Sequence, residues 1–346
     1  MRAIQVKEHV QGPSDLRVST VPDPVPSPNQ YLIEVHAAAA NFFDLLQIRG
    51  KYQHQPPLPW ISGAEFSGVI LSVPSSPSNG KGPTFQKGDK VFGSAQGAYA
   101  TKVCAIEAQL RPIPKGWSFT EAAGLMVTAP TSYAGLVTRA GMKKGDYVLI
   151  HAAAGGVGLA AVQIAKALGA TVIATASTAH KLEVARSFGA DHGINYSTTP
   201  DWPSEVKKLT PKSRGVDIVY DPVGLMIQST KCCAWNARLL VVGFAAGTIE
   251  KLPTNRLLLK NISAVGVHWG MYASMEPEMV DVVWRGLFGL INAGKFRGYC
   301  FDEKEFVGLE GVKGALSALG GRETWGKVVV EVSPEEDGKA IEKSKL

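Results

Sequence analysis

A glycine-rich stretch near the middle of the chain constrains the fold more than any other feature. Residues 151–158 read HAAAGGVG, between an apolar run that begins at Tyr147 and the amphipathic run LAAVQIAKALGA. A strand, a tight glycine turn and a helix in this order begin a βαβ unit, in which backbone N–H groups approach a pyrophosphate. Ala153, Gly155 and Gly158 occupy the three places of the G-x-G-x-x-G pattern. Because a helix N-terminus favours anions, we predict a dinucleotide-binding loop here.

The sequence around this loop alternates between apolar runs and helical periods, from about residue 129 to 267. The apolar runs YVLIHA, TVIATA, DIVYD and LLVVGF suit a parallel sheet that is buried on both faces. LAAVQIAKAL and AHKLEVARSF, which lie between them, have helical periodicity. The pattern predicts an α/β fold, with a doubly wound parallel-sheet domain of the Rossmann type over residues 129–267.

The flanking regions have a different texture. Residues 1–128 consist of short β-rich runs between Pro and Gly, which is typical of an irregular antiparallel barrel or sandwich. Residues 74–84, PSSPSNGKGPT, are expected to form a surface loop. Residues 268–332 contain helical segments and one strand, KVVVEV, and are predicted to return to the first domain. Residues 333–346 are charged and poor in apolar side chains, so we expect a flexible tail.

Composition excludes several classes of protein. The chain has 346 residues, 19% of them charged, and its net charge of +6 is not gathered into a basic block, so nucleic acid is not an expected partner. The four cysteines form no C-x-x-C pair, which indicates free thiols in a reducing compartment. The chain has no run of 18 apolar residues and no signal-peptide pattern, so we expect it neither to span a membrane nor to be secreted.

The residues after the second apolar run bear on the choice of dinucleotide. NAD enzymes place an Asp or Glu about 20 residues beyond the glycine loop, against the ribose 2′-hydroxyl. Here TVIATA is followed by STAHK, which has no carboxylate, and Ser177 and Lys181 offer a hydroxyl and an ammonium group. A carboxylate would repel a 2′-phosphate, whereas these groups would receive it. The sequence therefore favours NADPH.

Nearly the whole chain, to about Val332, resembles the quinone oxidoreductase (zeta-crystallin-like) branch of the zinc-free medium-chain dehydrogenase/reductase superfamily. The motifs that carry the resemblance are NFFDLLQIRGKY, GAEFSG, FQKGDKVFG, HAAAGGVGLAAVQIAKALGA, GADHGINY, VDIVYDPVG, LLLKNISAVGVHWG and GRETWGKVVV. The resemblance implies a GroES-like β-rich catalytic domain beside the Rossmann domain, and a homodimer. The chain departs from the family pattern in the loop at 74–84 and in QHQPPLPW after Tyr52, so the substrate is less certain than the class of chemistry.

The resemblance also implies a set of cofactor-binding residues. Those expected along the cofactor are Thr131, Gly155, Gly156, Val157, Phe244 and Val267. Those expected around the adenosine phosphate are Lys181, Tyr196 and Arg322, beside Ser177.

No metal site is expected. Where zinc-dependent relatives carry a Cys and a His as zinc ligands, this chain has Asn41 and Ala64, and it has no C-x-x-C-x-x-C cluster. Zinc requires three or four N, S or O ligands, and the seven histidines are scattered singly. Without a Lewis acid, oxidation of an alcohol is disfavoured, and reduction of an electrophilic acceptor remains.

Such a reduction needs a hydrogen-bond donor. Hydride addition to a quinone, or to the β-carbon of an α,β-unsaturated carbonyl, leaves an oxyanion or enolate that must be stabilised and protonated. Tyr52 and Asn41 are the catalytic candidates, because the family places the matching tyrosine beside the nicotinamide. Alternatively, Tyr52 only lines the pocket. Asp44, in the same motif, is expected to be a structural hydrogen-bonding residue.

Two questions stay open at this stage. Quinone, enone and enoyl-thioester acceptors cannot be separated by one sequence. The chain could also be a non-enzymatic NADPH-binding protein, similar to the lens crystallins related to this family, although Tyr52 and Asn41 favour an enzyme.

The last three residues, Ser344, Lys345 and Leu346, match a peroxisomal targeting signal that an import receptor reads. A short match of this kind also arises by chance in a lysine-rich tail. We expect the peroxisomal matrix, with the cytoplasm as the alternative.

Overall fold

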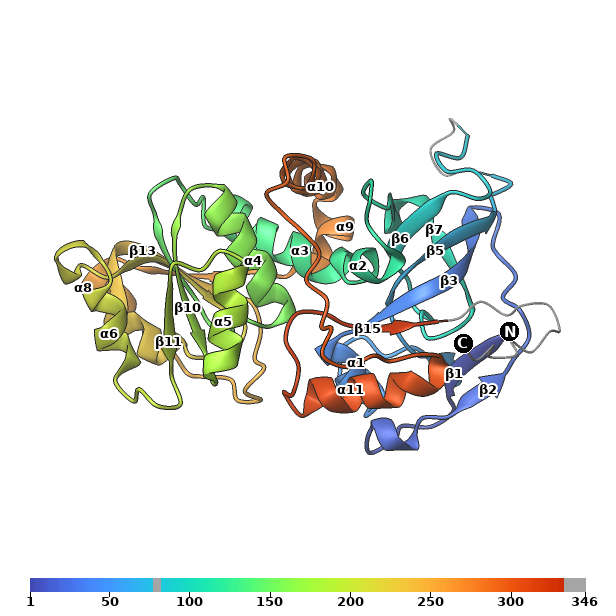
Figure 1. The fold of residues 1–346 in the computed structure, drawn as a ribbon, viewed down its shortest axis with the longest axis horizontal. Helices are drawn as coiled ribbons and strands as arrows, with labels where there is room; N and C mark the ends of the chain where they lie inside the picture. Colours follow the sequence, from blue (N-terminus) through green and yellow to red (C-terminus); the bar gives the residue numbers. More distant parts are fainter. Residues whose placement is uncertain (77–81, 333–346) are drawn as a thin grey trace, which may run out of the picture. The chain divides into compact units, whose positions relative to one another are not determined.

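The computed structural model describes residues 1–76 and 82–332, which form two compact units (Figure 1). Of the described residues, the first unit contains 1–76, 82–126, 300–323 and 328–332, and the second contains Val127–Tyr299 and Thr324–Lys327. The chain therefore passes from one unit to the other four times.

A six-stranded parallel sheet, in the order β11-β10-β9-β12-β13-β14, forms the centre of the second unit. Its strands are β9 (Tyr147–Ile150), β10 (Thr171–Ala176), β11 (His192–Asn195), β12 (Val216–Asp221), β13 (Cys233–Val241) and β14 (Ser263–Gly266). The central strands are buried along almost their whole length, as their apolar sequences predict. The order reverses at β9, which has β10 on one side and β12 on the other. Ligands of open parallel sheets bind beyond the carboxyl ends of the strands at such a reversal.

Helices flank this sheet and complete the predicted Rossmann domain. They are α3 (Leu125–Tyr133), α4 (Gly156–Ala167), α5 (Ala179–Ser187), α6 (Trp202–Lys208), α7 (Met226–Ser229), α8 (Asn255–Lys260), α9 (Tyr272–Met275) and α10 (Pro277–Asn292). In Figure 1, α4 and α5 lie side by side in front of β10, and both contact that strand. All residues from Gly158 to Ala165 of α4 are buried, because this helix packs closely on the sheet.

The first unit is an antiparallel curled sheet, as a GroES-like domain predicts. Its main sheet has the order β15-β3-β5-β6-β8, and a smaller sheet has the order β2-β1-β4. The strands are β1 (Arg2–Val6), β2 (Val18–Thr20), β3 (Gln30–Ala40), β4 (Trp60–Ile61), β5 (Glu65–Ser72), β6 (Lys90–Ser94), β7 (Lys102–Ile106), β8 (Leu110–Pro112) and β15 (Val328–Glu331). Two register shifts bend the long β3 against β5. Its other edge pairs first with β7 and then with β15, which curls the sheet around one apolar core.

The C-terminal return begins later than residue 268, where the sequence analysis placed it. The segment from 268 to 299, which includes α9 and α10, belongs to the second unit, and the first unit resumes at Cys300. Gln163 of α4 exchanges two hydrogen bonds with the backbone of Arg297, of 2.9 and 3.2 Å. Gly286 of α10 packs against the ring of Tyr133 so closely that a Cβ would lie 2.1 Å from the phenol oxygen. These contacts tie α10 and its following turn to α3 and α4. After Cys300, α11 (Val312–Gly320) packs against α1 (Phe42–Gln47) in the first unit.

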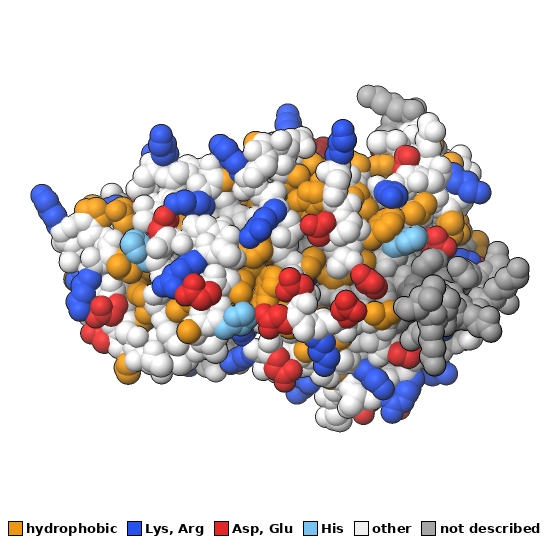
Figure 2. Space-filling model, in the orientation of Figure 1, with side chains coloured by type: hydrophobic (Ala, Val, Ile, Leu, Met, Phe, Trp, Pro, Cys, Tyr) orange, Lys and Arg blue, Asp and Glu red, His pale blue; other side chains and the backbone are white. Residues whose placement is uncertain are grey.

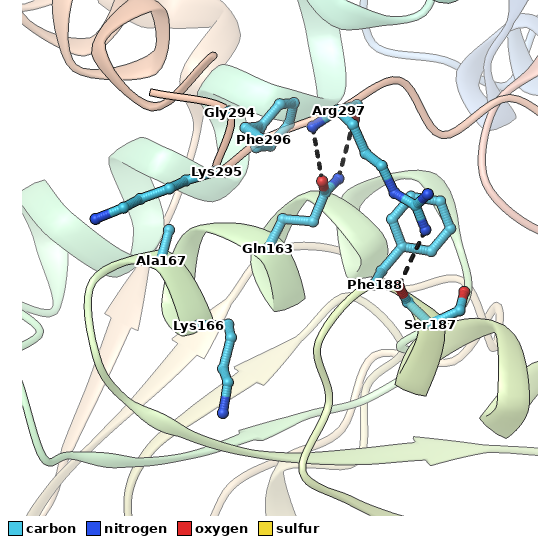
Figure 3. A pocket seen from close by; sticks show the side chains of 9 residues that line it. All are labelled: Gln163, Lys166, Ala167, Ser187, Phe188, Gly294, Lys295, Phe296 and Arg297. Atoms are coloured by element: carbon cyan, nitrogen blue, oxygen red, sulfur yellow. Dashed lines mark hydrogen bonds between the residues drawn. The ribbon is translucent and has the colours of Figure 1, made fainter. Parts of the chain in front are cut away.

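A surface hollow of about 440 Å³ lies beside the contacts between α4 and the turn after α10 (Figure 3). The guanidinium of Arg297 lies 4.3 Å from the ring centre of Phe188 and donates to the carbonyl of Ser187. Lys166 forms an ion pair with Asp191. Because Gln163, Lys166 and Arg297 of its lining are engaged in contacts within the protein, we interpret the hollow as a gap between packed segments of the second unit.

Other expectations from composition can be compared with the described residues. None of the helices in this part of the chain is long and apolar enough to cross a membrane. All four cysteines are free, as expected, and burial raises the pKa of Cys232 to about 12. On the face drawn in Figure 2, Lys and Arg side chains are interspersed with Asp and Glu. Part of the predicted loop at 74–84 and the whole predicted tail lie outside the described residues.

Candidate cofactor site and active site

The glycine loop connects β9 to α4 at the reversal of the sheet. The chain turns at Ala152, whose φ of 45° is in the left-handed region, and Gly155 then caps α4. The N–H of Gly155 donates to the carbonyl of Ala152 at 2.8 Å, and that of Ala153 donates to Thr175 of β10 at 3.0 Å. This turn presents the N-terminus of a twelve-residue helix beyond the carboxyl ends of the strands. The arrangement suits an anionic group such as a pyrophosphate.

The first and third small residues of the motif have separate structural roles. Ala153 is fully buried beneath the loop. At Gly158, a Cβ would lie 2.3 Å from the carbonyl oxygen of Ala152 and 2.7 Å from that of Ala153, so this position admits only glycine. The third glycine therefore lets α4 approach the end of β9, as the motif requires.

Three of the residues predicted around the adenosine phosphate lie at the ends of β10 and β11. Ser177 follows β10, and Thr178 caps α5 by accepting a hydrogen bond from the N–H of Lys181 at 3.2 Å. The N–H of Tyr196 donates to the carbonyl of Ala176 at 3.2 Å, which brings the end of β11 beside the end of β10. The structure thus brings Ser177, Lys181 and Tyr196 to one edge of the sheet. Arg322 belongs to the other unit, directly after α11, and its role at the phosphate stays a prediction.

The other predicted cofactor residues also belong to the second unit. Thr131 lies on α3, where its hydroxyl donates to the carbonyl of Val127 at 2.7 Å. Gly156 and Val157 form the first turn of α4. Phe244 follows β13 and is partly exposed, and Val267 follows β14, where its N–H donates to Val241 at 3.0 Å. Each of the last two residues therefore lies beyond the carboxyl end of a strand.

A buried histidine beneath the glycine loop was not anticipated from the sequence. The hydroxyl of Ser229 donates to the carbonyl of Leu225 at 2.7 Å, so it accepts from Nε2 of His151, 2.9 Å away. Nδ1 lies 2.8 Å from the Thr175 hydroxyl and accepts from it. His151 is therefore a neutral imidazole that ties the ends of β9 and β10 to α7. Complete burial lowers its pKa to about 4, although the nearby Asp221 carboxylate acts in the opposite direction.

In the first unit, the predicted catalytic motif forms a buried polar cluster at the start of α1. Asp44 accepts hydrogen bonds from the backbone N–H of Asn41 at 2.9 Å and from the phenol of Tyr99 at 2.7 Å. The amide nitrogen of Asn41 donates to Glu65 at 2.9 Å. The structural role predicted for Asp44 agrees with these contacts. Sequence reasoning missed Glu65 and Tyr99; the only signal was a carboxylate and a phenol within otherwise apolar strand runs.

Tyr52 lies in the turn after α1, where its ring stacks on Phe43 at a centroid distance of 5.4 Å. Partial burial, and to a smaller extent the charge of Asp44, raise the pKa of its phenol. The phenol therefore stays protonated near neutral pH and can donate a hydrogen bond. The amide hydrogens of Asn41 point instead toward Glu65 and, more weakly, toward the carbonyl of Ala39 at 3.4 Å. Of the two catalytic candidates, Tyr52 is the better placed donor.

Comparisons with known proteins support this arrangement. Residues 27–126 match the alcohol dehydrogenase GroES-like domain family, and residues 156–285 match the zinc-binding dehydrogenase family. A quinone oxidoreductase-like protein 2 homolog from Nematostella vectensis is 36% identical over 87% of this chain and 81% of the relative. Human quinone oxidoreductase is 33% identical over 80% of this chain and 82% of the relative.

The chain belongs to the medium-chain dehydrogenase/reductase superfamily. Within this superfamily, its relatives include quinone oxidoreductases in both sequence and structure. The structure of Escherichia coli quinone oxidoreductase complexed with NADPH superposes with a TM-score of 0.83 and 29% identity, covering 96% of this chain and all of that one. The fold class predicted from the sequence is thereby confirmed for both units of this superfamily member.

The buried His151 predicts a dependence of stability on pH. The native state holds the imidazole neutral down to about pH 4, whereas the unfolded chain takes up a proton near the ordinary value of 6.5. Stability is therefore lost as the pH falls from 6.5 toward 4, by up to about 3 kcal/mol. Urea unfolding at pH 7 and pH 5 measures this loss. His151→Gln should reduce it, whereas replacement of the exposed His180 by Gln should not, and an equal loss in both variants would contradict the assignment.

Proposed function

We propose that the chain is an NADPH-dependent oxidoreductase that delivers hydride to a quinone or an α,β-unsaturated carbonyl without a metal. The observation that carries this proposal is the glycine loop at the sheet reversal, beside β10, which is followed by Ser177 and not by a carboxylate. The NADPH complex of the Escherichia coli quinone oxidoreductase supports the choice of cofactor.

In this proposal, the chain's own residues bind the cofactor and stabilise the oxygen that gains charge. Bound NADPH supplies a hydride to the acceptor. The loop around Gly155 and the first turn of α4 bind the pyrophosphate, and Ser177 and Lys181 receive the 2′-phosphate. Tyr52 donates a hydrogen bond to the oxygen that gains charge, and a proton then completes the two-electron reduction.

The metal-free part of the proposal rests on residue chemistry. Asn41 and Ala64 stand where zinc-dependent relatives carry ligands, and neither an alanine nor an amide nitrogen engaged with Glu65 suits zinc. The described residues contain no group of three or more His, Cys, Asp or Glu side chains that could hold a metal ion.

The direct test is NADPH oxidation measured against quinones, enones and enoyl thioesters, with and without a strong chelator. Turnover of at least one class that survives chelation is expected. Loss of activity after chelation, restored by zinc, would contradict the metal-free mechanism. Tight NADPH binding with negligible turnover of every acceptor would favour the non-enzymatic alternative.

Lys181→Glu tests the assignment of the cofactor. A charge-assisted hydrogen bond contributes roughly 1.5 to 3 kcal/mol, so the variant should lose at least about tenfold in affinity for NADPH. Affinity for NADH, which lacks the 2′-phosphate, should change little. Calorimetric titration with both dinucleotides gives the ratio, and an unchanged ratio would refute the role of Lys181.

Tyr52→Phe tests the hydrogen-bond donor. The variant keeps the ring that stacks on Phe43 and loses only the hydroxyl, so kcat should fall by about 10²-fold while NADPH affinity is retained. Tyr147→Phe, at the far end of β9, serves as the matched control. A change confined to KM would show that Tyr52 only lines the pocket.

We also propose a homodimer that forms through the edge of the parallel sheet. β14 pairs with β13 alone among the described strands, and most of its residues are exposed. Leu258 and Leu259 on α8, 80% and 74% exposed, lie on the segment that leads into β14. An open strand edge with apolar neighbours is a template for pairing with another chain. Light scattering should give twice the mass of the chain, and a monomer at micromolar concentration would contradict this proposal.

The targeting signal at Ser344, Lys345 and Leu346 lies outside the described residues and stays a proposal drawn from the sequence. A fluorescent protein that ends in residues 333–346 should enter peroxisomes of a eukaryotic cell through the import receptor. The same fusion without Leu346 should remain diffuse. A diffuse signal from the intact fusion would refute the peroxisomal assignment and leave the cytoplasmic one.

A further inference from the structure

The segment Thr324–Lys327, which belongs to the second unit, contacts the glycine loop. The N–H of Gly326 donates to the carbonyl of Ala154 at 2.7 Å, and Gly326 forms a parallel bridge with Gly155. The N–H of Lys327 donates to the carbonyl of Tyr299 at 2.9 Å. Gly326 has a φ of +56°, and a Cβ there would lie 2.1 Å from the Tyr299 oxygen, so only glycine fits. The backbone of this segment is therefore fixed against the loop.

The side chain of Lys327 lies across the first turn of α4. A Cβ on Gly156 would be 3.1 Å from Cδ of Lys327 and 3.2 Å from the methyl group of Thr128. Thr128 is itself held by a hydrogen bond of 2.7 Å between its hydroxyl and that of Tyr299. Lys327 is only 3% exposed, which is rare for lysine. The aliphatic stem of Lys327, at least as far as Cδ, therefore lies against the first turn of α4.

The buried position of Lys327 bears on how strongly an anion is attracted to the N-terminus of α4. The glycine loop and the N-terminus of α4 already favour an anion through backbone N–H groups and the helix dipole. Attraction between an ammonium group and an anion is stronger where burial excludes bulk water than at an exposed lysine.

We propose that Lys327 is a cofactor-binding residue: its ammonium group attracts the dinucleotide pyrophosphate, and its aliphatic stem holds Gly156 in place. This inference rests on the dinucleotide-binding half of the proposed function and is independent of the acceptor. It adds a second cation of the GRETWGKVVV segment, besides the predicted Arg322, to the residues expected around the cofactor.

The test separates the charge of Lys327 from its packing. Lys327→Met keeps an unbranched apolar stem and removes the charge, whereas Lys327→Arg keeps the charge; the exposed Lys295→Met is the matched control. NADPH affinity is measured by calorimetry at low and high salt, together with the melting temperature of the unliganded protein. Lys327→Met should bind NADPH about tenfold more weakly or worse at low salt, and most of the deficit should persist at high salt because a buried charge pair is screened much less than an exposed one. Lys327→Arg should recover most of the affinity.

Two results would overturn the inference. One is Lys327→Met binding NADPH as tightly as the native protein at both salt concentrations. The other is equal weakening in the Met and Arg variants together with equal losses of melting temperature, which would reduce Lys327 to a packing role. Failure of the native protein to bind NADPH would instead contradict the proposed function as well, so the two failures can be told apart.

Discussion

The close approach of α4 to the end of β9 is the constraint on which the second unit depends. It exists because Gly158 has no Cβ, so the helix rests directly on the carbonyl groups of Ala152 and Ala153. This approach buries the run from Gly158 to Ala165 and fixes the direction in which the helix N-terminus points. His151 beneath the turn and the segment at 324–327 above it both take their positions from the same loop. The anion-binding geometry is thus a product of packing as much as of hydrogen bonding.

In the first unit, Asp44 holds separate segments of the chain together. Its carboxylate caps α1 through the backbone of Asn41 and accepts from the buried Tyr99, so it joins this helix to the connection between β6 and β7. Burial, with a smaller contribution from the charge of Asp44, raises the pKa of the Tyr52 phenol. One structural carboxylate therefore fixes the backbone next to Asn41 and links α1 to Tyr99. The Asn41 amide donates to Glu65, which directs this donor away from any external acceptor.

The parallel strands and the glycine loop could be predicted because their signals are local. A strand buried on both faces must be apolar throughout, and β10 coincides with the run TVIATA. The residues that were missed gain their importance from contacts between distant segments. Glu65 meets Asn41 across 24 residues and His151 meets Ser229 across 78, and no local pattern marks such pairs. The placement of α10 failed for the same reason, since the hydrogen bonds between Gln163 and Arg297 join segments 134 residues apart.

Because the chain passes between the units four times, the unit that begins the chain is not the first to be completed during synthesis. By Tyr299 the ribosome has produced all of the second unit except Thr324–Lys327, and the parallel sheet is complete. The first unit, although its sequence begins the chain, still lacks α11 and β15, so β3 has an open edge beside Ala37–Ala40. Domains fold as units when their residues become available, so the unit that is translated first is completed last. No single cut in the chain can separate the two units, and an exchange of either unit with a relative must replace several segments at once.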